Sequence, residues 1–494
     1  MGPDSTADAP GKLAQLKLFF QPRGGCNKND AGSNCSLLTY GWLNGNGSLQ
    51  GDTILFGLGV HPVRRGPDGP VQAGPDITDL LDPESPQKLR AIFLSHAHTD
   101  EFEGVVRYLE HGYRLPPVYG DELTINIVKE KLRGRAPQDL WPEMHIMKPG
   151  APVQVGAFSL EAVQMGHTLS GSGLIARAGG VGVFFTGDFK LDQTMLTPKT
   201  DLARLEKMGR DREIDVLLLD STRADKTTEL TPEAEIRENI RQIASRHPDK
   251  RINIVLETGN AEALARSGWL AAQESRVYIH HGCTIGQRLC AMNKSGMDLP
   301  TLTGHDNLIV TSGSTQLAGR LHPSYVLNIM AGVNGEASSV FSRVCRGEYE
   351  HFRAGPEDVF IFSAMIRPWS ALRIEENLRA LRERGIEHIY LNGPEQPRTD
   401  ESGHETAPGL LRLQQLVQPK SAVVGIVGSN DKREACRVLF NRAGSGPDAL
   451  KLDNGTILGI TPTGTTLAGH QPTELVQIPV RPKLHLPTGE LKAA

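Results

Sequence analysis

The chain has 494 residues, a formal net charge of -4 and an isoelectric point near 6.5. This length is enough for two or three domains that each bury a core. This charge balance excludes a strongly basic protein that binds nucleic acid over its whole surface. Local basic patches remain compatible with the charge balance. No apolar stretch approaches the length of a membrane span and the polar N-terminus has no signal core, so we expect no membrane partner.

The six cysteines lack the paired spacing of a zinc ribbon. They are typical of reduced thiols in a cytoplasmic protein, and we expect that location. Residues 1–14 are polar and contain Ala, Pro and Gly, which predicts a flexible leader.

Two short alternating segments, residues 16–20 and 36–40, predict neighbouring strands near the start of the chain. Residues 24–30 between them form a turn-rich loop. The Gly-, Pro- and Asp-rich residues 63–86 favour a plain surface connection. Four apolar residues at 91–94 then predict a buried strand.

A polar cluster follows that strand directly, with the sequence Ser95-His96-Ala97-His98-Thr99-Asp100-Glu101. If the alternation of the strand continues, His96, His98 and Asp100 leave the chain on one side and converge on one ion. Three ligand types at this spacing favour a metal site over chance histidines in a polar loop.

Two later stretches supply further ligands. His167 follows an alternating segment at residues 158–162, and Asp188 follows the apolar run 182–185. Each residue alone is more typical of a core or a turn. Together with His96 and His98 they form a set of three imidazoles and one carboxylate that is able to hold zinc.

The rest of the pattern alternates helices and strands. Helices are predicted at residues 104–109, 122–132 and 202–208, and strands at residues 117–120, 216–219, 253–256, 277–279, 308–310, 359–362 and 422–427. Thr231 is the predicted N-cap of one more helix, with Pro232 at its first position. The alternation up to about residue 395 indicates a parallel sheet flanked by helices.

Residues 312–315 form a small polar loop after one of these strands. The hydroxyl groups of Ser312 and Ser314, together with the backbone N–H groups, suit a phosphate. An ordinary turn between a strand and a helix is equally compatible with this sequence.

Several motifs resemble one family when they are taken in order. Ser-His-Ala-His-Thr-Asp from residue 95, Gly-His-Thr from residue 166 and Thr-Gly-Asp-Phe-Lys from residue 186 resemble the metallo-β-lactamase superfamily. Asp-Ser-Thr from residue 220 and Ser-Gly-His-Glu from residue 402 resemble its ribonuclease J-like branch, which carries a β-CASP insert.

The resemblance implies an α/β fold, namely a metallo-β-lactamase αββα sandwich with an inserted β-CASP α/β domain. The implied domains are a first lactamase-like part at residues 15–228, the insert at 229–395, a second lactamase-like part at 396–472 and a tail at 473–494. That tail is too short for the further C-terminal domain through which many relatives dimerise, so homo-oligomer formation stays open.

Three departures from the family pattern affect the second metal position. Glu101 stands where the family has a histidine, residues 55–59 contain no acid where the family has an aspartate, and residues 426–429 lack a late histidine. Only Asp100 and Asp188, with Glu101 if it turns inward, then remain for a second ion. Such a carboxylate site suits manganese, magnesium or iron better than zinc.

The resemblance implies a metal-dependent hydrolase that cleaves phosphodiester bonds, with RNA as the expected substrate and a metal-activated water as the nucleophile. Asp100 or Glu101 is the expected base, and His404 a phosphate ligand or proton donor. Ser363 and His404 are the implied contacts to a substrate phosphate.

Alternatives stay open at this stage. The metal site fits a mononuclear hydrolase, a mixed-metal enzyme or a pseudoenzyme that keeps only the fold. The reaction fits a nuclease, or a repurposed biosynthetic hydrolase or lyase that acts on a small phosphorylated metabolite. Glu101 is either a general base or a solvated carboxylate at a helix N-terminus.

Overall fold

The computed structural model describes residues 16–26, 32–66, 69–297, 318–393, 395–444, 446–471, 473 and 475–476. The predicted leader, the strand at 308–310, the loop with Ser312 and Ser314, and most of the tail lie outside the described residues. Within the described part, no helix combines the length and the apolar character that crossing a bilayer requires.

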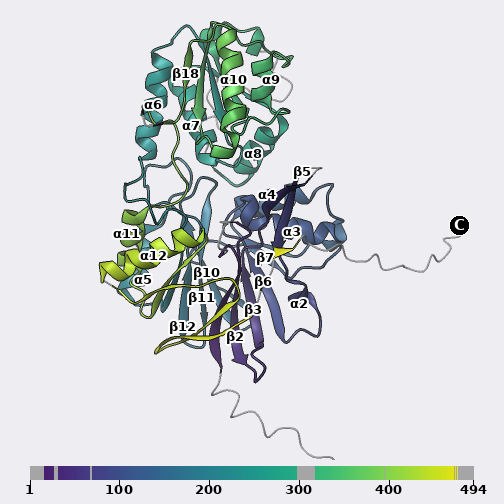
Figure 1. Cartoon of the computed structure of the whole chain (residues 1–494), viewed down its shortest axis with the longest axis vertical. Helices are drawn as coiled ribbons and strands as arrows, with labels where there is room; N and C mark the ends of the chain where they lie inside the picture. Colours follow the sequence, from purple (N-terminus) through teal and green to yellow (C-terminus); the bar gives the residue numbers. More distant parts are fainter. Residues whose placement is uncertain are drawn as a thin grey trace, which may run out of the picture.

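Two large sheets form the lower body in Figure 1. The first has the order β22-β21-β1-β2-β3-β6-β7-β8, and the second has the order β20-β19-β13-β12-β11-β10-β9. The strands of the first sheet are β1 (Lys17–Gly24), β2 (Cys35–Leu43), β3 (Leu49–Phe56), β6 (Gln87–Phe93), β7 (Val118–Gly120), β8 (Met144–Ile146), β21 (Thr456–Thr461) and β22 (Gly464–His470). Those of the second are β9 (Val153–Val155), β10 (Phe158–Met165), β11 (Gly171–Ala178), β12 (Val181–Phe185), β13 (Val216–Asp220), β19 (Ala422–Ile426) and β20 (Ala449–Lys451).

The apolar faces of the two sheets pack on each other. Phe56 of the first sheet stacks on Phe185 of the second, with ring centroids 4.8 Å apart. Helices cover both outer faces: α3 (Thr99–Glu110) and α4 (Glu122–Leu132) lie on the first sheet, while α5 (Leu202–Arg210), α11 (Ala407–Val417) and α12 (Asn430–Ala443) lie on the second. The predicted αββα sandwich is therefore confirmed.

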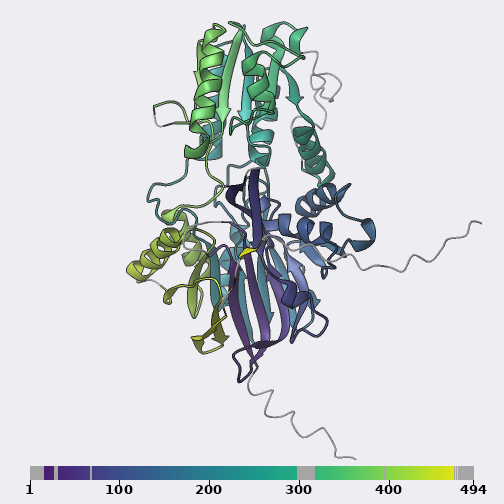
Figure 2. The same ribbon diagram turned by 45° about the vertical axis from the view of Figure 1, so that its right-hand side comes forward.

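A third sheet forms the upper body, with the order β15-β16-β14-β17-β18 and all strands parallel. Its strands are β14 (Arg251–Leu256), β15 (Val277–His281), β16 (Val326–Ala331), β17 (Asp358–Ser363) and β18 (His388–Tyr390). The helices α6 (Glu233–Ser245), α7 (Ala261–Gln273) and α8 (Cys283–Lys294) pack on one face, and α9 (Val340–Arg346) and α10 (Ala371–Glu383) on the other. Figure 2 shows this α/β body above the sandwich. The boundaries at residues 229 and 395 stay predictions.

Three local predictions were wrong. Residues 63–86 contain β4 (His61–Gly66), β5 (Gly69–Pro75) and α2 (Thr78–Leu81), not a plain connection; β23 (Leu475–Val476) pairs with β5. The N-cap of α6 is Pro232, not Thr231, and no side chain caps this helix. The backbone N–H of Thr231 donates to Glu401 instead of being part of the helix start. The strand alternation also ends at Phe93, since Thr99 already begins α3.

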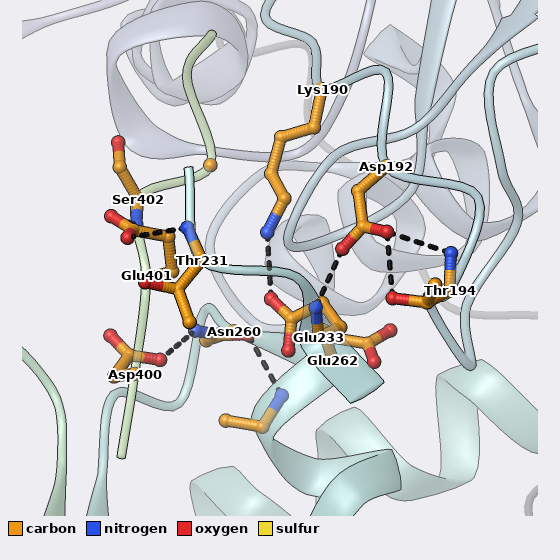
Figure 3. Close-up of polar contacts among 12 residues, drawn as sticks. Lys190, Asp192, Thr194, Thr231, Glu233, Asn260, Glu262, Asp400, Glu401 and Ser402 are labelled. Carbon is orange, nitrogen blue, oxygen red and sulfur yellow. Dashed lines mark hydrogen bonds and ion pairs between the residues drawn. The ribbon is translucent and has the colours of Figure 1, made fainter. Parts of the chain in front are cut away.

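A buried ion network joins the insert to the sandwich. Lys190, which follows β12, donates to Glu233 on α6 over 2.6 Å, and both side chains are at most 1% exposed. Glu233 also pairs with Arg266 on α7, which reaches Asp400 at 3.0 Å. Figure 3 shows Lys190, Glu233 and Asp400 with the polar groups around them. Charges this deeply buried are stable only while each keeps its partners.

Replacing Lys190 by methionine tests this network. Lys190→Met leaves Glu233 with one cation fewer, and we expect the free energy of unfolding to fall by about 3–5 kcal/mol. The measurement is urea unfolding in the presence of a chelator, so that metal binding does not contribute. Lys207→Met is the matched control, because the Lys207–Asp211 pair spans 2.7 Å on the surface and exposed pairs contribute little. Equal effects of the two substitutions would contradict a structural role for the network.

Candidate metal centre

Four side chains meet at the junction of the two sheets and the insert. They are His96 from the loop after β6, His98 from the N-cap of α3, His167 from the loop after β10 and Asp188 from the loop after β12. One ligand atom from each lies within 4.8 Å of all the others. The sequence-based hypothesis for one four-ligand group thus corresponds to a real cluster in space.

Hydrogen bonds orient the three imidazoles. His98 donates from Nε2 to the carbonyl of Gly259 over 3.2 Å, and His167 donates from Nδ1 to the carbonyl of Gly403 over 2.8 Å. His96 Nδ1 lies 2.9 Å from Ser95 Oγ, whose own proton goes to Glu101. Each ring therefore donates its N–H to a group outside the cluster. The other nitrogen of each ring, which faces into the cluster, carries a lone pair.

The inward nitrogens fit a divalent cation. His96 Nε2 is buried and has no hydrogen-bond partner among the described residues. His98 Nδ1 lies 3.2 Å from His167 Nε2, and His96 Nε2 lies 3.4 Å from Asp188 Oδ2. Two ligands about 2.0–2.1 Å from a tetrahedral zinc ion are about 3.3 Å apart. Lone pairs at such distances repel each other unless a cation lies between them, so the donor set fits zinc.

The pKa values agree with this assignment. Burial lowers the pKa of His96 and of His167 well below the ordinary value, and the neighbouring histidines add to the effect. Burial also lowers the pKa of His98, although Asp100 and Glu257 oppose it. Neutral imidazole is the form that binds metals. Burial raises the pKa of Asp188 well above its ordinary value, a direction that a bound divalent cation inverts.

A second group lies beside the first and shares Asp188 with it. It consists of Asp188, Asp220 at the end of β13 and His404. His404 Nδ1 lies 2.8 Å from Asp220 Oδ2 and 3.8 Å from Asp188 Oδ2. Burial lowers the pKa of His404, but the two carboxylates outweigh burial and raise it to about 9. The arrangement is a histidine held as a cation against two acids.

Asp100 and Glu101 lie beside the two ligand groups, close enough for both to raise the pKa of Asp188. Asp100 belongs to the first turn of α3 and to neither of the two ligand groups. Glu101 is only 1% exposed and accepts from Ser95, so it is not a solvated carboxylate. Burial and the nearby Asp100 raise the pKa of Glu101 to about 8. Glu101 therefore supports His96 through Ser95 rather than facing a substrate.

Ser363 is also placed in the interior. Its hydroxyl donates to the carbonyl of Thr399 and accepts from Arg266, and the residue is 1% exposed. These bonds occupy the hydroxyl within the ion network, so its proton is not available to a substrate phosphate. His404 remains partly exposed, with 26% of its side chain accessible.

Two further positions bear on the second metal site. Gly57 adopts a positive φ of 68°, and a side chain there would meet Asn34 and Glu101 at about 3 Å. Ser429 is the N-cap of α12. Neither place supplies an acid or an imidazole, which agrees with the departures noted in the sequence.

A cleft of about 530 Å3 opens between the sandwich and the end of α8. Its lining includes Lys148, Gln164, Ser170, Lys199 and Ser295 but none of the metal-cluster side chains. Ser170 is three residues beyond His167, so the cleft borders the loop that carries this ligand.

Comparisons with known proteins agree with the geometry. Residues 70–280 match the family described as Beta-lactamase superfamily domain. Ribonuclease J of Mycolicibacterium smegmatis is 25% identical over 403 residues, or 80% of this chain and 67% of the relative. Ribonuclease J of Sinorhizobium meliloti is 26% identical over 450 residues, or 90% of this chain and 75% of the relative. The chain spans 52% of the ribonuclease J of Synechocystis sp..

One solved structure, a protein of unknown function from Enterococcus faecalis, superposes with a TM-score of 0.62 at 16% identity. The match covers 90% of this chain and all of the other, and it supports the fold. The fold and the ligand cluster define the protein as a metal-dependent hydrolase with a metallo-β-lactamase fold. Within that fold, the similarity to these ribonuclease J proteins supports the resemblance to the ribonuclease J-like branch with a β-CASP insert.

Sequence reasoning missed Asp220 as a partner of His404 and the two carbonyls that orient the histidines. A signal for Asp220 was present, because it ends a buried strand just as Asp188 follows one, and β12 and β13 are parallel neighbours. The carbonyls of Gly259 and Gly403 leave no trace in side-chain identity, since any residue has a carbonyl.

Replacing a direct ligand should remove the metal. We expect His98→Ala to weaken zinc binding by more than about tenfold, because even outer-shell partners contribute 10- to 100-fold to affinity. Elemental analysis of the purified protein measures this. His145→Ala is the control, since His145 is 44% exposed, pairs with Glu143, stacks on Tyr119 and belongs to neither ligand group. Retained zinc in His98→Ala would exclude His98 as a ligand.

Ser95→Ala tests the support of His96 separately. The substitution deletes the group that holds Nδ1 of His96, so we expect zinc affinity to fall about 10- to 100-fold while the fold is kept. Chelator competition measures the affinity and circular dichroism monitors the fold. An unchanged affinity would show that Ser95 does not orient the ring.

Proposed function

We propose that the protein hydrolyses phosphodiester bonds in RNA. The observation that carries this proposal is the Asp220–His404 pair, which shares Asp188 with the metal cluster. A cluster that binds one cation next to a histidine held by a carboxylate is suited to phosphodiester cleavage, where both the attacked phosphate and the leaving oxygen need assistance. The ribonuclease J relatives support RNA as the substrate.

The metal ligands are His96, His98, His167 and Asp188. When bound, the divalent ion supplies a Lewis acid for the phosphate and lowers the pKa of a bound water. Zinc fits the three nitrogen ligands best. The neighbouring group of Asp188, Asp220 and His404 can bind a second metal ion only if His404 loses its proton. We therefore propose one metal ion per chain.

His404 is the proposed general acid. Its Nδ1 donates to Asp220, which holds the ring in place and favours the imidazolium form. Its Nε2 has no hydrogen-bond partner within the described residues, and the ring is partly exposed. We propose that this nitrogen protonates the ribose oxygen that leaves the phosphorus. Asp100 and Glu101, which the sequence suggested as bases, are not needed for this protonation step.

The decisive experiment compares two substrates with and without zinc. One is 5′-phosphorylated single-stranded RNA and the other is bis(p-nitrophenyl) phosphate, a phosphodiester without a base. Cleavage of both, with about one zinc per chain, supports the proposal. Cleavage of the small diester alone moves the substrate to a small phosphorylated molecule, and cleavage of neither identifies a pseudoenzyme.

His404→Gln tests the general acid. We expect kcat for RNA to fall by about 10²- to 10⁴-fold, because a ribose alkoxide leaves poorly without a proton. The loss for bis(p-nitrophenyl) phosphate should be much smaller, since p-nitrophenolate is a stable leaving group, and the zinc content should not change. Equal losses on both substrates would contradict the assignment and indicate a binding role.

A further inference from the structure

A short exposed segment of the insert carries an unusual group of side chains. Three of the six large apolar residues that are exposed in the described part of the chain lie between residues 365 and 372. They are Met365, Trp369 and Leu372, with 45%, 60% and 83% of the residue exposed. We call residues 365–373 the Trp369 segment. An exposed indole beside other apolar groups is typical of a binding surface.

The segment leaves the sheet on the side of the metal cluster. It follows β17, and Ser363 at the end of β17 pairs with Leu256 at the end of the parallel strand β14. Gly259, three residues beyond Leu256, accepts the hydrogen bond from His98. Because neighbouring strands are about 4.8 Å apart, both loops leave the same edge of the sheet. The Trp369 segment therefore borders the approach to the metal centre.

The segment is anchored from inside. Ser370 is fully buried, and its hydroxyl donates to the carbonyl of Arg367 over 3.0 Å. The short helix η4 (Pro368–Ser370) then leads into α10. This anchoring fixes the backbone on both sides of Trp369, so a ligand would meet an indole whose backbone is already in position.

Positive charge accompanies the indole. The guanidinium carbon of Arg373 lies 5.8 Å from the centre of the Trp369 ring, and Arg367 is exposed two residues earlier. An indole with flanking arginines suits an unpaired base, which stacks on the ring while the guanidinium groups face the phosphates. The exposed acids Glu375 and Glu376 follow on α10 and would repel the phosphates of a nucleic acid there. The surface suited to a nucleic acid is therefore limited to the Trp369 segment.

We propose that Trp369, with Arg367 and Arg373, is a stacking platform for an unpaired base of single-stranded RNA on its way to the metal centre. This inference rests on the proposed function and extends it to a substrate with unpaired bases. It also makes Trp369 a determinant of the preference for RNA over small phosphodiesters.

Tryptophan fluorescence tests the platform directly. The probe is a 5′-phosphorylated oligouridylate of about ten nucleotides, titrated in a chelator so that it stays intact. We expect it to quench the fluorescence of the full chain and of Trp269→Phe, but not that of Trp369→Phe. Trp269 is the matched control, because Arg237 lies 5.8 Å from its ring in the same kind of pair. Quenching that survives in Trp369→Phe would overturn the proposal.

Affinity and kinetics complete the test. Trp369→Ala should weaken binding of the oligonucleotide about 5- to 150-fold, the range for one stacked base. It should raise KM for RNA and leave turnover of bis(p-nitrophenyl) phosphate unchanged. If neither substrate is cleaved, the proposed function is wrong. The quenching result still shows whether Trp369 binds the oligonucleotide. Unchanged RNA affinity in Trp369→Ala would mean that the segment serves another occupant, such as a protein partner.

Discussion

Three imidazole lone pairs point at one another in the metal cluster, and the rest of the structure must hold them there. Their mutual repulsion is relieved only by a cation. The three outward hydrogen bonds supply the necessary constraint. One comes from Ser95 in the same loop, and the other two come from distant parts of the chain, namely the carbonyl of Gly259 in the insert and the carbonyl of Gly403 in the returning segment. The metal centre is therefore a property of the assembled protein rather than of the sandwich alone.

The buried ion network serves the same end at a larger scale. Lys190 is two residues beyond the ligand Asp188, and Asp400 is four residues before His404. Between them, Glu233 and Arg266 bind both segments to the insert. Glu262 on α7 adds a backbone contact from its N–H to Thr168, the neighbour of the ligand His167. A displacement of the insert would thus move the metal ligands and His404, the proposed general acid, together.

The second metal position shows how one site changes its chemistry without changing its fold. Glu101 takes the place of a family histidine, yet it turns into the core and supports His96 through Ser95. The second ligand group, beside the first, consists of Asp188, Asp220 and His404. In this group the imidazole of His404 is hydrogen-bonded to the carboxylate of Asp220. A cationic imidazole and a second metal ion both place positive charge against two carboxylates, so either occupant satisfies the same electrostatic requirement.

The sequence by itself determined many of the strands, among them β6, β12 and β13, the helices α3 to α6 and the side chains of the first cluster, because apolar periodicity and ligand type are local properties. It also indicated the sandwich and its insert through the order of the motifs. It missed the remaining helices and strands such as β3, β11 and β16. Only the tertiary structure decided the roles of Asp100, Glu101 and Ser363, since the direction of a side chain depends on what packs around it. The same is true of Asp220 and of the carbonyls of Gly259 and Gly403. These groups act through distance, and distances between remote segments are set by the fold rather than by any local pattern.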